Sequence, residues 1–320
     1  MSFTGCLVRS TLSLSLFTLS LTGTTAAHAL DAYQTQEKLS GELVIRGSGT
    51  VGKAAKVWVK AFSERYPNVK IDITEAGSGD GAKAVIGGSA NIGNMSRKMK
   101  SKEVRAFENK FGYKPTEIRV GVDAVGVVVH KDNPVKSMSL AQIDALFSTT
   151  ASCGGNVSAK WADVGVEGTI GGVAPKLNIR NPGSGTRAFF KKKALCGGEF
   201  KATANEFVHS NDLVASVRND EAAIGFISMG KLNDSVKTVA VSKGGRSPVS
   251  PDMYNVSSGK YPLSRYLYMY VNRVPGQPLD PHVKEFIKFV VSNEGQAIVS
   301  DVGYVPINDR VAASVKKFLY

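Results

Sequence analysis

The stretch Arg180-Asn181-Pro182-Gly183-Ser184-Gly185-Thr186-Arg187 carries the strongest fold signal in this chain of 320 residues. It joins an apolar run that predicts a strand to a run that predicts a helix. Its glycines permit a tight turn, and Ser184 and Thr186 place hydroxyl donors beside the first backbone N–H groups of the helix. Such a helix start, with unpaired amides and a positive dipole end, suits an anion, and Arg180 and Arg187 add charge on either side.

Turns of the same kind occur twice more in the chain. The tetrapeptide Gly47-Ser48-Gly49-Thr50 lies between a predicted strand at 42–46 and a predicted helix at 53–66, and Gly77-Ser78-Gly79 follows a second predicted strand at 69–74. Strand, helix and strand in this order form a βαβ unit. Three such turns in one chain predict a single oxyanion that is held from several sides.

The order of the predicted elements indicates an α/β fold with mainly parallel sheets. Two groups of anion-binding turns, at 47–97 and at 180–187, are separated by a long apolar strand at 121–130. Ligands of open α/β sheets bind beyond the carboxyl ends of the strands, so we expect two lobes that close on a ligand in the cleft between them. Further strands are predicted at 177–180, 222–228 and 267–271, and further helices at 82–86, 98–111, 139–147, 186–195, 211–217 and 282–293.

A dinucleotide site is an alternative interpretation of the first turn. Residues 47–52 fit the pattern G-x-G-x-x-G, and Asp72 lies in the second predicted strand, where such a site has its acidic residue. The predicted export of the chain and the second copy of Gly-Ser-Gly-Thr at 183–186 weigh against it. Because nicotinamide cofactors are scarce outside the cytoplasm, we predict no cofactor.

The N-terminal segment, residues 1–29, has the pattern of a secretory signal peptide. Arg9 is the sole charged residue before Asp31, the run 12–21 is apolar with interspersed Ser and Thr, and Ala27-His28-Ala29 forms an A-x-A cleavage site. We therefore predict cleavage after about Ala29 and a periplasmic location, with secretion as the alternative.

The composition is that of a soluble globular protein, with 42% hydrophobic and 21% charged residues. The formal net charge is +13, and loss of the leader removes a single arginine from this balance. A net positive charge favours binding of anionic partners. We expect no nucleic-acid binding, because the chain is predicted to be exported and has no basic stripe interleaved with aromatic residues.

The cysteines and histidines bear on disulfides and metals. The mature chain retains Cys153 and Cys196, and an even pair in an exported protein predicts a disulfide. The four histidines are scattered along the chain. We therefore predict no metal site.

With these features assembled, the chain resembles the phosphate-binding proteins of bacterial ABC importers, within the type II periplasmic binding-protein superfamily. The likeness spans about residues 41–310. The motifs that carry it, beyond the turns above, are GSGDG at 77–81, NIGNMSR at 91–97, AIGF at 223–226, YPLSR at 261–265, SNEGQ at 292–296 and GYVP at 303–306. Their order and spacing together make the signal specific.

The resemblance implies two α/β lobes, each a mainly parallel sheet flanked by helices, joined by two crossover strands. The first lobe would combine residues 30–122 with 256–320, and the second would span 123–255. The resemblance also implies an exported monomer that captures inorganic phosphate in the cleft and delivers it to an ABC permease in the inner membrane. No catalytic residue is implied.

The same resemblance implies which residues bind the phosphate. Thr50 and Ser78 would supply hydroxyls and Val51 a backbone N–H from the first lobe, while the second lobe would contribute the turn at 180–187. With their neighbours, the predicted phosphate-binding residues are Ser48, Gly49, Thr50, Val51, Ser78, Gly79, Asp80, Ser96, Arg97, Arg180, Ser184, Gly185 and Thr186.

One position departs from the family pattern. Where the best-known members have an aspartate that accepts the proton of hydrogen phosphate, this chain has Ser96, followed by Arg97. A serine hydroxyl can accept a hydrogen bond from hydrogen phosphate, but it does not repel a fully ionised anion. Arg97 would strengthen anion binding in general. Asp80 and a main-chain carbonyl are the alternative acceptors, so selectivity for phosphate over sulfate is left open.

Two other functions are compatible with the sequence. A secreted phosphatase would use Ser48 or Ser184 as nucleophile, but no histidine accompanies either serine and no Asp and His cluster offers two metal sites. An adhesion or signalling protein could keep the same cleft. Single residues also have structural alternatives: Ser184 and Thr186 as helix caps, and Arg97 in a salt bridge between the lobes.

Overall fold

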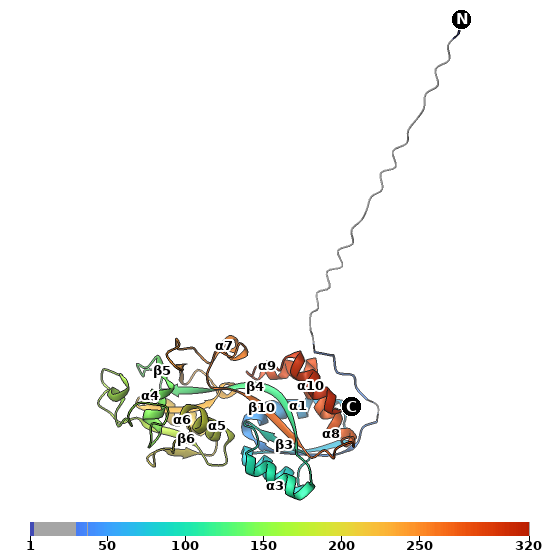
Figure 1. Cartoon of the computed structure of the whole chain (residues 1–320), viewed down its shortest axis with the longest axis horizontal. Coiled ribbons are helices and arrows are strands. Elements are labelled where there is room, and N and C mark those ends of the chain that lie inside the picture. Colours follow the sequence, from blue (N-terminus) through green and yellow to red (C-terminus); the bar gives the residue numbers. More distant parts are fainter. Residues whose placement is uncertain (3–29, 37, 320) are drawn as a thin grey trace.

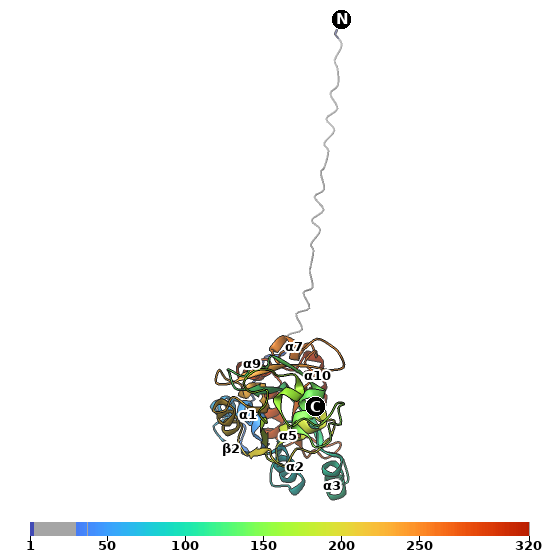
Figure 2. The ribbon, with the colours of Figure 1, turned by 90° about the vertical axis from the view of Figure 1, so that its left-hand side faces the viewer.

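The protein forms two lobes placed end to end along its long axis (Figure 1). The computed structural model describes residues 1–2, 30–36 and 38–319, so the predicted signal peptide falls outside the described residues apart from its first two. The view along the long axis shows one lobe in front of the other (Figure 2). Strands β4 (Thr116–Val129) and β10 (Ser264–Val271) run between the lobes and join them.

The remaining strands are β1 (Gly41–Ser48), β2 (Val69–Ala76), β3 (Ile92–Met95), β5 (Ser137–Ser139), β6 (Lys176–Arg180), β7 (Asn205–Phe207), β8 (Ala223–Ser228) and β9 (Lys237–Ser242). They pair in the order β2-β1-β3-β10-β4-β8-β6-β7, with β9 paired to β4 and β5. Within the lobes, β1 is parallel to β2 and β3, and β6 is parallel to β7 and β8. The two crossover strands are antiparallel to each other, β10 is antiparallel to β3, and β4 is antiparallel to β8. The predicted α/β architecture of two lobes is therefore confirmed.

The helices cover the sheet of each lobe. The first lobe contains α1 (Gly49–Arg65), α2 (Ser78–Gly87), α3 (Ser101–Phe111), α8 (Pro281–Val290), α9 (Asn293–Asp301) and α10 (Asp309–Leu319). The second contains α4 (Leu140–Phe147), α5 (Gly185–Ala194), α6 (Ser210–Arg218), α7 (Met253–Ser257) and the short 3-10 helices η1 (Trp161–Val164) and η2 (Met229–Lys231). The sequence did not predict α7, because its five residues are too few to show a helical period, and it did not predict α9 or α10 after the helix at 282–293. The helix predicted at 282–293 ends earlier, since the Ser292 hydroxyl caps the start of α9.

Each lobe has its own hydrophobic core. Trp58 and Phe286 are buried in the first core, and Trp161 and Phe226 in the second. β4 contributes to both cores and passes from the first to the second around Asp123, whereas β10 contributes to the first core and is preceded by Leu263 of the second. The lobe boundaries predicted at 122/123 and 255/256 stay a prediction.

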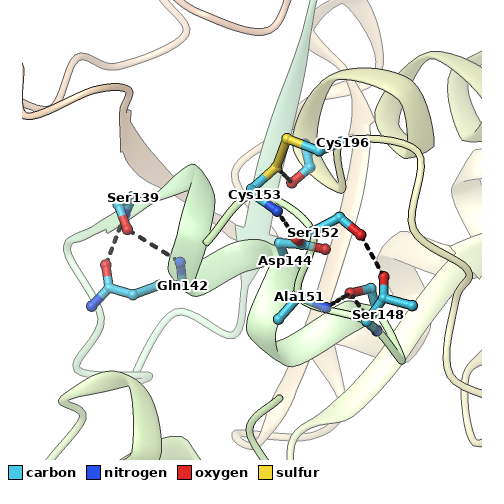
Figure 3. The surroundings of a disulfide bond; sticks show 10 residues. Ser139, Gln142, Asp144, Ser148, Ala151, Ser152, Cys153 and Cys196 are labelled. Atoms are coloured by element: carbon cyan, nitrogen blue, oxygen red, sulfur yellow. Dashed lines mark hydrogen bonds between the residues drawn. A yellow bond between two sulfur atoms is a disulfide. The ribbon is translucent and has the colours of Figure 1, made fainter. Parts of the chain in front are cut away.

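The predicted disulfide between Cys153 and Cys196 is present in the second lobe (Figure 3). Cys196 follows the end of α5, and Cys153 lies in the loop after α4. The backbone N–H of Cys153 donates to the carboxylate of Asp144 on α4 at 2.6 Å. The bond therefore ties the C-terminal end of α5 to α4, while the N-terminal end of α5 carries the central turn of the sequence.

Replacing both cysteines by serine is expected to lower the free energy of unfolding by about 2–4 kcal/mol, because the bond closes a long loop in the unfolded chain. The two cysteines are 43 positions apart in the sequence. Urea unfolding of the variant Cys153→Ser/Cys196→Ser beside the oxidised wild type measures the difference. The reduced wild type is the matched control and should behave as the variant does; equal stability of all three proteins would contradict the prediction.

Candidate functional site

Three helix N-termini meet where the two lobes face each other. α1 and α2 begin directly after β1 and β2 of the first lobe, and α5 begins after β6 of the second. The N–H groups of a first helical turn have no partners within the helix, and the helix dipoles place partial positive charge at the same ends. Donors and positive potential from both lobes are therefore directed at one region.

Direct contacts join the turns of the two lobes. Thr50 Oγ1 on α1 lies 3.3 Å from Thr186 Oγ1 on α5. The backbone N–H of Gly79 on α2 donates to the carbonyl of Gly183 at 3.4 Å. A Cβ atom on Gly185 would lie 2.1 Å from Ser78 Oγ, so the approach of α5 to α2 requires glycine. The structure thus brings the three predicted turns together.

Four hydroxyl groups, those of Thr50, Ser78, Ser96 and Thr186, form what we call the hydroxyl cluster. All four side chains are buried. The N–H of Ser96, just after β3, donates to Ser78 Oγ at 3.0 Å, and the two hydroxyl oxygens lie 3.3 Å apart. Because Ser78 Oγ accepts from this amide, its own hydrogen can be donated to Ser96 or to a ligand.

Ser48 and Ser184 are the N-caps of α1 and α5. The Ser48 hydroxyl accepts from the N–H of Thr50 and the Ser184 hydroxyl from the N–H of Arg187, each at 3.3 Å. The capping alternative is confirmed for Ser184, whereas Thr186 turns its hydroxyl to Thr50. A capping hydroxyl can still donate its hydrogen, so the predicted contact of both serines with an anion stays a prediction.

The remaining predicted donors of the first lobe lie at the starts of α1 and α2. Gly49 and Val51 belong to the first turn of α1, and the side chain of Val51 is fully buried. Asp80 is exposed, and its Oδ2 accepts from the N–H of Gly77 at 2.9 Å, which completes the capping box of α2. This position at the solvent edge makes Asp80 a weaker candidate than Ser96 for accepting a ligand proton inside the site.

Arg97 forms an ion pair within the first lobe. Its Nη1 and Nη2 donate to the two carboxylate oxygens of Glu103 on α3, each at 2.7 Å. Burial opposes ionisation of Glu103, but the bonds from Arg97 and from the Lys100 backbone lower the pKa of this carboxyl. The alternative of a salt bridge between the lobes is therefore wrong, because both partners belong to the same lobe. The contribution of Arg97 to anion binding stays a prediction.

Arg180 uses its guanidinium within the second lobe. Nε and Nη2 donate to the carbonyls of Phe207 and Val208, and Nη1 donates to the Ser210 hydroxyl at 2.7 Å. Burial, together with the charge of Arg265, lowers the pKa of Arg180 to about 10, so it remains charged at neutral pH. The structure thus directs this side chain to residues 207–210 at the start of α6, and its predicted contact with an anion stays a prediction.

Sequence reasoning missed the arginine that contacts the hydroxyl cluster. Nη2 of Arg265 on β10 donates to Thr186 Oγ1 at 2.9 Å and to Asp123 Oδ2 at 2.7 Å, and Nε donates to the same carboxylate oxygen at 3.0 Å. Asp123 on β4 also accepts from the Ser228 hydroxyl and the Met229 N–H. Burial raises the pKa of the Asp123 carboxyl, and these donors oppose the rise. A charged residue inside the apolar run 121–130 was the available signal.

The residues described above supply hydrogen-bond donors and positive charge. None of them forms a pair of nucleophile and general base. In the chain as far as the structure describes it, no group of three or more His, Cys, Asp and Glu side chains could hold a metal ion. Converging helix starts, hydroxyls and guanidinium groups are suited to binding a dehydrated oxyanion.

The chain is similar to known proteins along most of its length. The family model for the PBP superfamily domain matches residues 32–294. The chain is 43% identical over 293 residues to the phosphate-binding protein PstS of Pseudomonas aeruginosa PAO1, with 91% of each chain covered. It resembles the structure of a putative phosphate ABC transporter substrate-binding protein with bound phosphate from Clostridium perfringens, with a TM-score of 0.71, 28% identity, and coverage of 84% of this chain and 100% of that chain. An ABC-type phosphate transport receptor from Vibrio cholerae shares the fold, with a TM-score of 0.66, 22% identity, and coverage of 83% and 100%.

Gly185→Ala is expected to weaken oxyanion binding about tenfold or more. The added Cβ would lie 2.1 Å from Ser78 Oγ and 2.5 Å from Ser96 Oγ, so α5 must move away from α2, and such overpacking costs about 1–3 kcal/mol. Calorimetric titration with phosphate measures the loss. Gly87→Ala at the end of α2 is the control, because the nearest atom to its new Cβ lies at 3.9 Å. Equal affinity of the two variants would contradict the prediction.

Proposed function

This chain belongs to the PBP superfamily, in the family of the phosphate-binding protein PstS, and on that premise we propose that it captures inorganic phosphate and delivers it to an ABC importer. The observation that carries the proposal is the meeting of three helix N-termini, two from one lobe and one from the other, around the hydroxyl cluster. A bound anion accepts from both lobes at once. It therefore favours the arrangement in which the lobes are in contact.

The proposed site includes an acceptor for the proton of hydrogen phosphate. When Ser96 donates its hydroxyl hydrogen to Ser78, the Ser96 oxygen can accept the ligand's O–H, and Ser78 can donate to a second phosphate oxygen. A neutral serine does not repel sulfate. The difference in binding free energy between phosphate and sulfate is therefore about that of one neutral hydrogen bond, roughly 0.5–1.5 kcal/mol. We therefore propose a preference for phosphate over sulfate of about tenfold or less.

The proposed location is the periplasm, after removal of residues 1–29. Across residues 30–36 and 38–319 the structure has no helix long and apolar enough to cross a membrane. Delivery to a permease in the inner membrane is proposed from relatives whose names describe a phosphate-binding protein and a phosphate ABC transporter substrate-binding protein. We propose that the protein acts as a monomer and releases phosphate unchanged.

Calorimetric titration of the mature protein with phosphate and with sulfate, each at pH 6 and pH 8, tests the proposed ligand. The protein is first freed of bound anion by partial unfolding and refolding. Phosphate is expected to bind with a dissociation constant of about 1 μM or lower, a free energy of about −8 kcal/mol, and sulfate up to tenfold more weakly. Phosphate should bind at both pH values, because the two serine hydroxyls can reverse their direction. Binding of neither anion would contradict the proposal.

Phosphate uptake by cells tests the proposed role as a carrier. Deletion of the gene in its host is expected to reduce uptake of radiolabelled phosphate at low external concentration, and the wild-type gene should restore it. The Gly185→Ala variant should restore uptake less well than Gly87→Ala does. Normal uptake in the deletion strain, together with phosphate binding by the purified protein, would favour the adhesion or signalling role instead.

A further inference from the structure

One guanidinium nitrogen beside the hydroxyl cluster is left without a partner. Nη1 of Arg265 is buried and makes no hydrogen bond to any residue within 30–36 and 38–319. The side chain of Arg265 is only 3% exposed. Buried polar atoms in folded proteins are almost always paired, and an unpaired donor on a charged group is especially unfavourable. The orphaned nitrogen therefore indicates a ligand atom.

The bonds of the other guanidinium nitrogens fix where Nη1 points. Nε and Nη2 form one edge of the planar group, and this edge faces Asp123. The second hydrogen of Nη2 is donated to Thr186 Oγ1 at 2.9 Å. In a planar guanidinium the neighbouring N–H of Nη1 runs parallel to that hydrogen, so it is directed alongside the Thr186 hydroxyl. Arg265 Cζ also lies over the ring of Phe189, 5.2 Å from its centroid.

The local charge also indicates a missing anion. Arg180 and Arg265 are both buried, and the charge of Arg265 contributes to the lowered pKa of Arg180, with Asp212 opposing. Asp123 accepts from one of the two guanidinium groups and the Arg180 nitrogens are bonded to neutral groups. Asp212 is exposed, so a bound anion would supply the second buried negative charge in this region.

We propose that Nη1 of Arg265 donates to the bound oxyanion and that Asp123 is the positioning residue that holds this guanidinium in place. The proposal rests on the function proposed above. Asp123 is itself fixed by the Ser228 hydroxyl at 2.7 Å and the Met229 N–H at 3.2 Å. Since Arg265 and Asp123 lie opposite each other on the crossover strands, the anion is held from a third direction besides the turns of the two lobes.

The test compares variants that keep or remove the buried charges in pairs. Arg265→Met alone would leave Asp123 buried without its partner and could unfold the protein, so it is combined with Asp123→Asn. This double variant is expected to bind phosphate on the order of 100-fold more weakly than the wild type, while its phosphate-free melting temperature stays close to the wild-type value. The control is Arg46→Met/Asp72→Asn, which removes an exposed ion pair of the first lobe and should bind as the wild type does.

Two further measurements separate the roles of the two residues. Arg265→Lys keeps the charge but loses the planar fork, so an intermediate loss of about tenfold is expected. Asp123→Asn alone should weaken binding about tenfold, which is less than the loss in the double variant, because Asp123 acts through Arg265. Binding by Asp123→Asn within about threefold of the wild type would overturn the positioning role.

The outcomes also distinguish this proposal from the proposed function. If the wild type binds phosphate and both the double variant and Arg265→Lys bind within about threefold of the control, the assignment of Arg265 is overturned and the phosphate carrier stands. If the double variant does not fold, Arg265→Lys is compared with the control alone, and phosphate binding within about threefold of the control overturns the assignment of Arg265. If the wild type binds neither phosphate nor sulfate, the proposed function and this assignment both fail.

Discussion

Backbone N–H groups at a helix start cannot be satisfied within the helix, and this protein buries three such starts against one another. Two of them come from the first lobe and one from the second, so both lobes direct backbone donors at the same region. Positive helix ends held together in this way are favourable when they share an anion. The glycines of the turns serve the same constraint, since a Cβ on Gly185 would collide with the hydroxyls of Ser78 and Ser96.

The crossover strands carry the polar groups that separate the two cores. The buried side chains change from one core to the other within β4 at Asp123, and between Leu263 and β10 beside Arg265. A buried ion pair is weak support for stability, because the cost of desolvation offsets much of the attraction. Its position beside Thr186, with one nitrogen unpartnered in the described part of the chain, is better explained by ligand binding than by folding alone.

The helices that present the donors are fixed by further contacts, at their starts and farther along. The Tyr304 hydroxyl donates to the carbonyl of Thr50 at 2.8 Å, and the Trp58 side chain, farther along α1, donates to the carbonyl of Gly295 at 2.7 Å. At the other end of α5, the disulfide at Cys196 ties the helix to α4 (Figure 3). Donors fixed in this way lose little conformational freedom when a ligand binds, so less of the interaction energy is spent on ordering them.

The sequence by itself determined the features that depend on local physics. Glycine turns, capping serines and hydrophobic periods act over a few residues, so the three Gly-Ser-Gly turns, the main strands and helices around them, and the cysteine pair could be predicted. The short strands β3, β5, β7 and β9 and the helices α7, α9 and α10 were not predicted. The tertiary structure decided which arginine faces the hydroxyl cluster. Arg180 belongs to the central turn, yet its side chain bonds to residues at the start of α6. Arg265, 79 positions from Thr186 in the sequence, donates to the Thr186 hydroxyl instead. The direction of a side chain at the end of a strand depends on which strands lie beside it, and no local pattern encodes that neighbour.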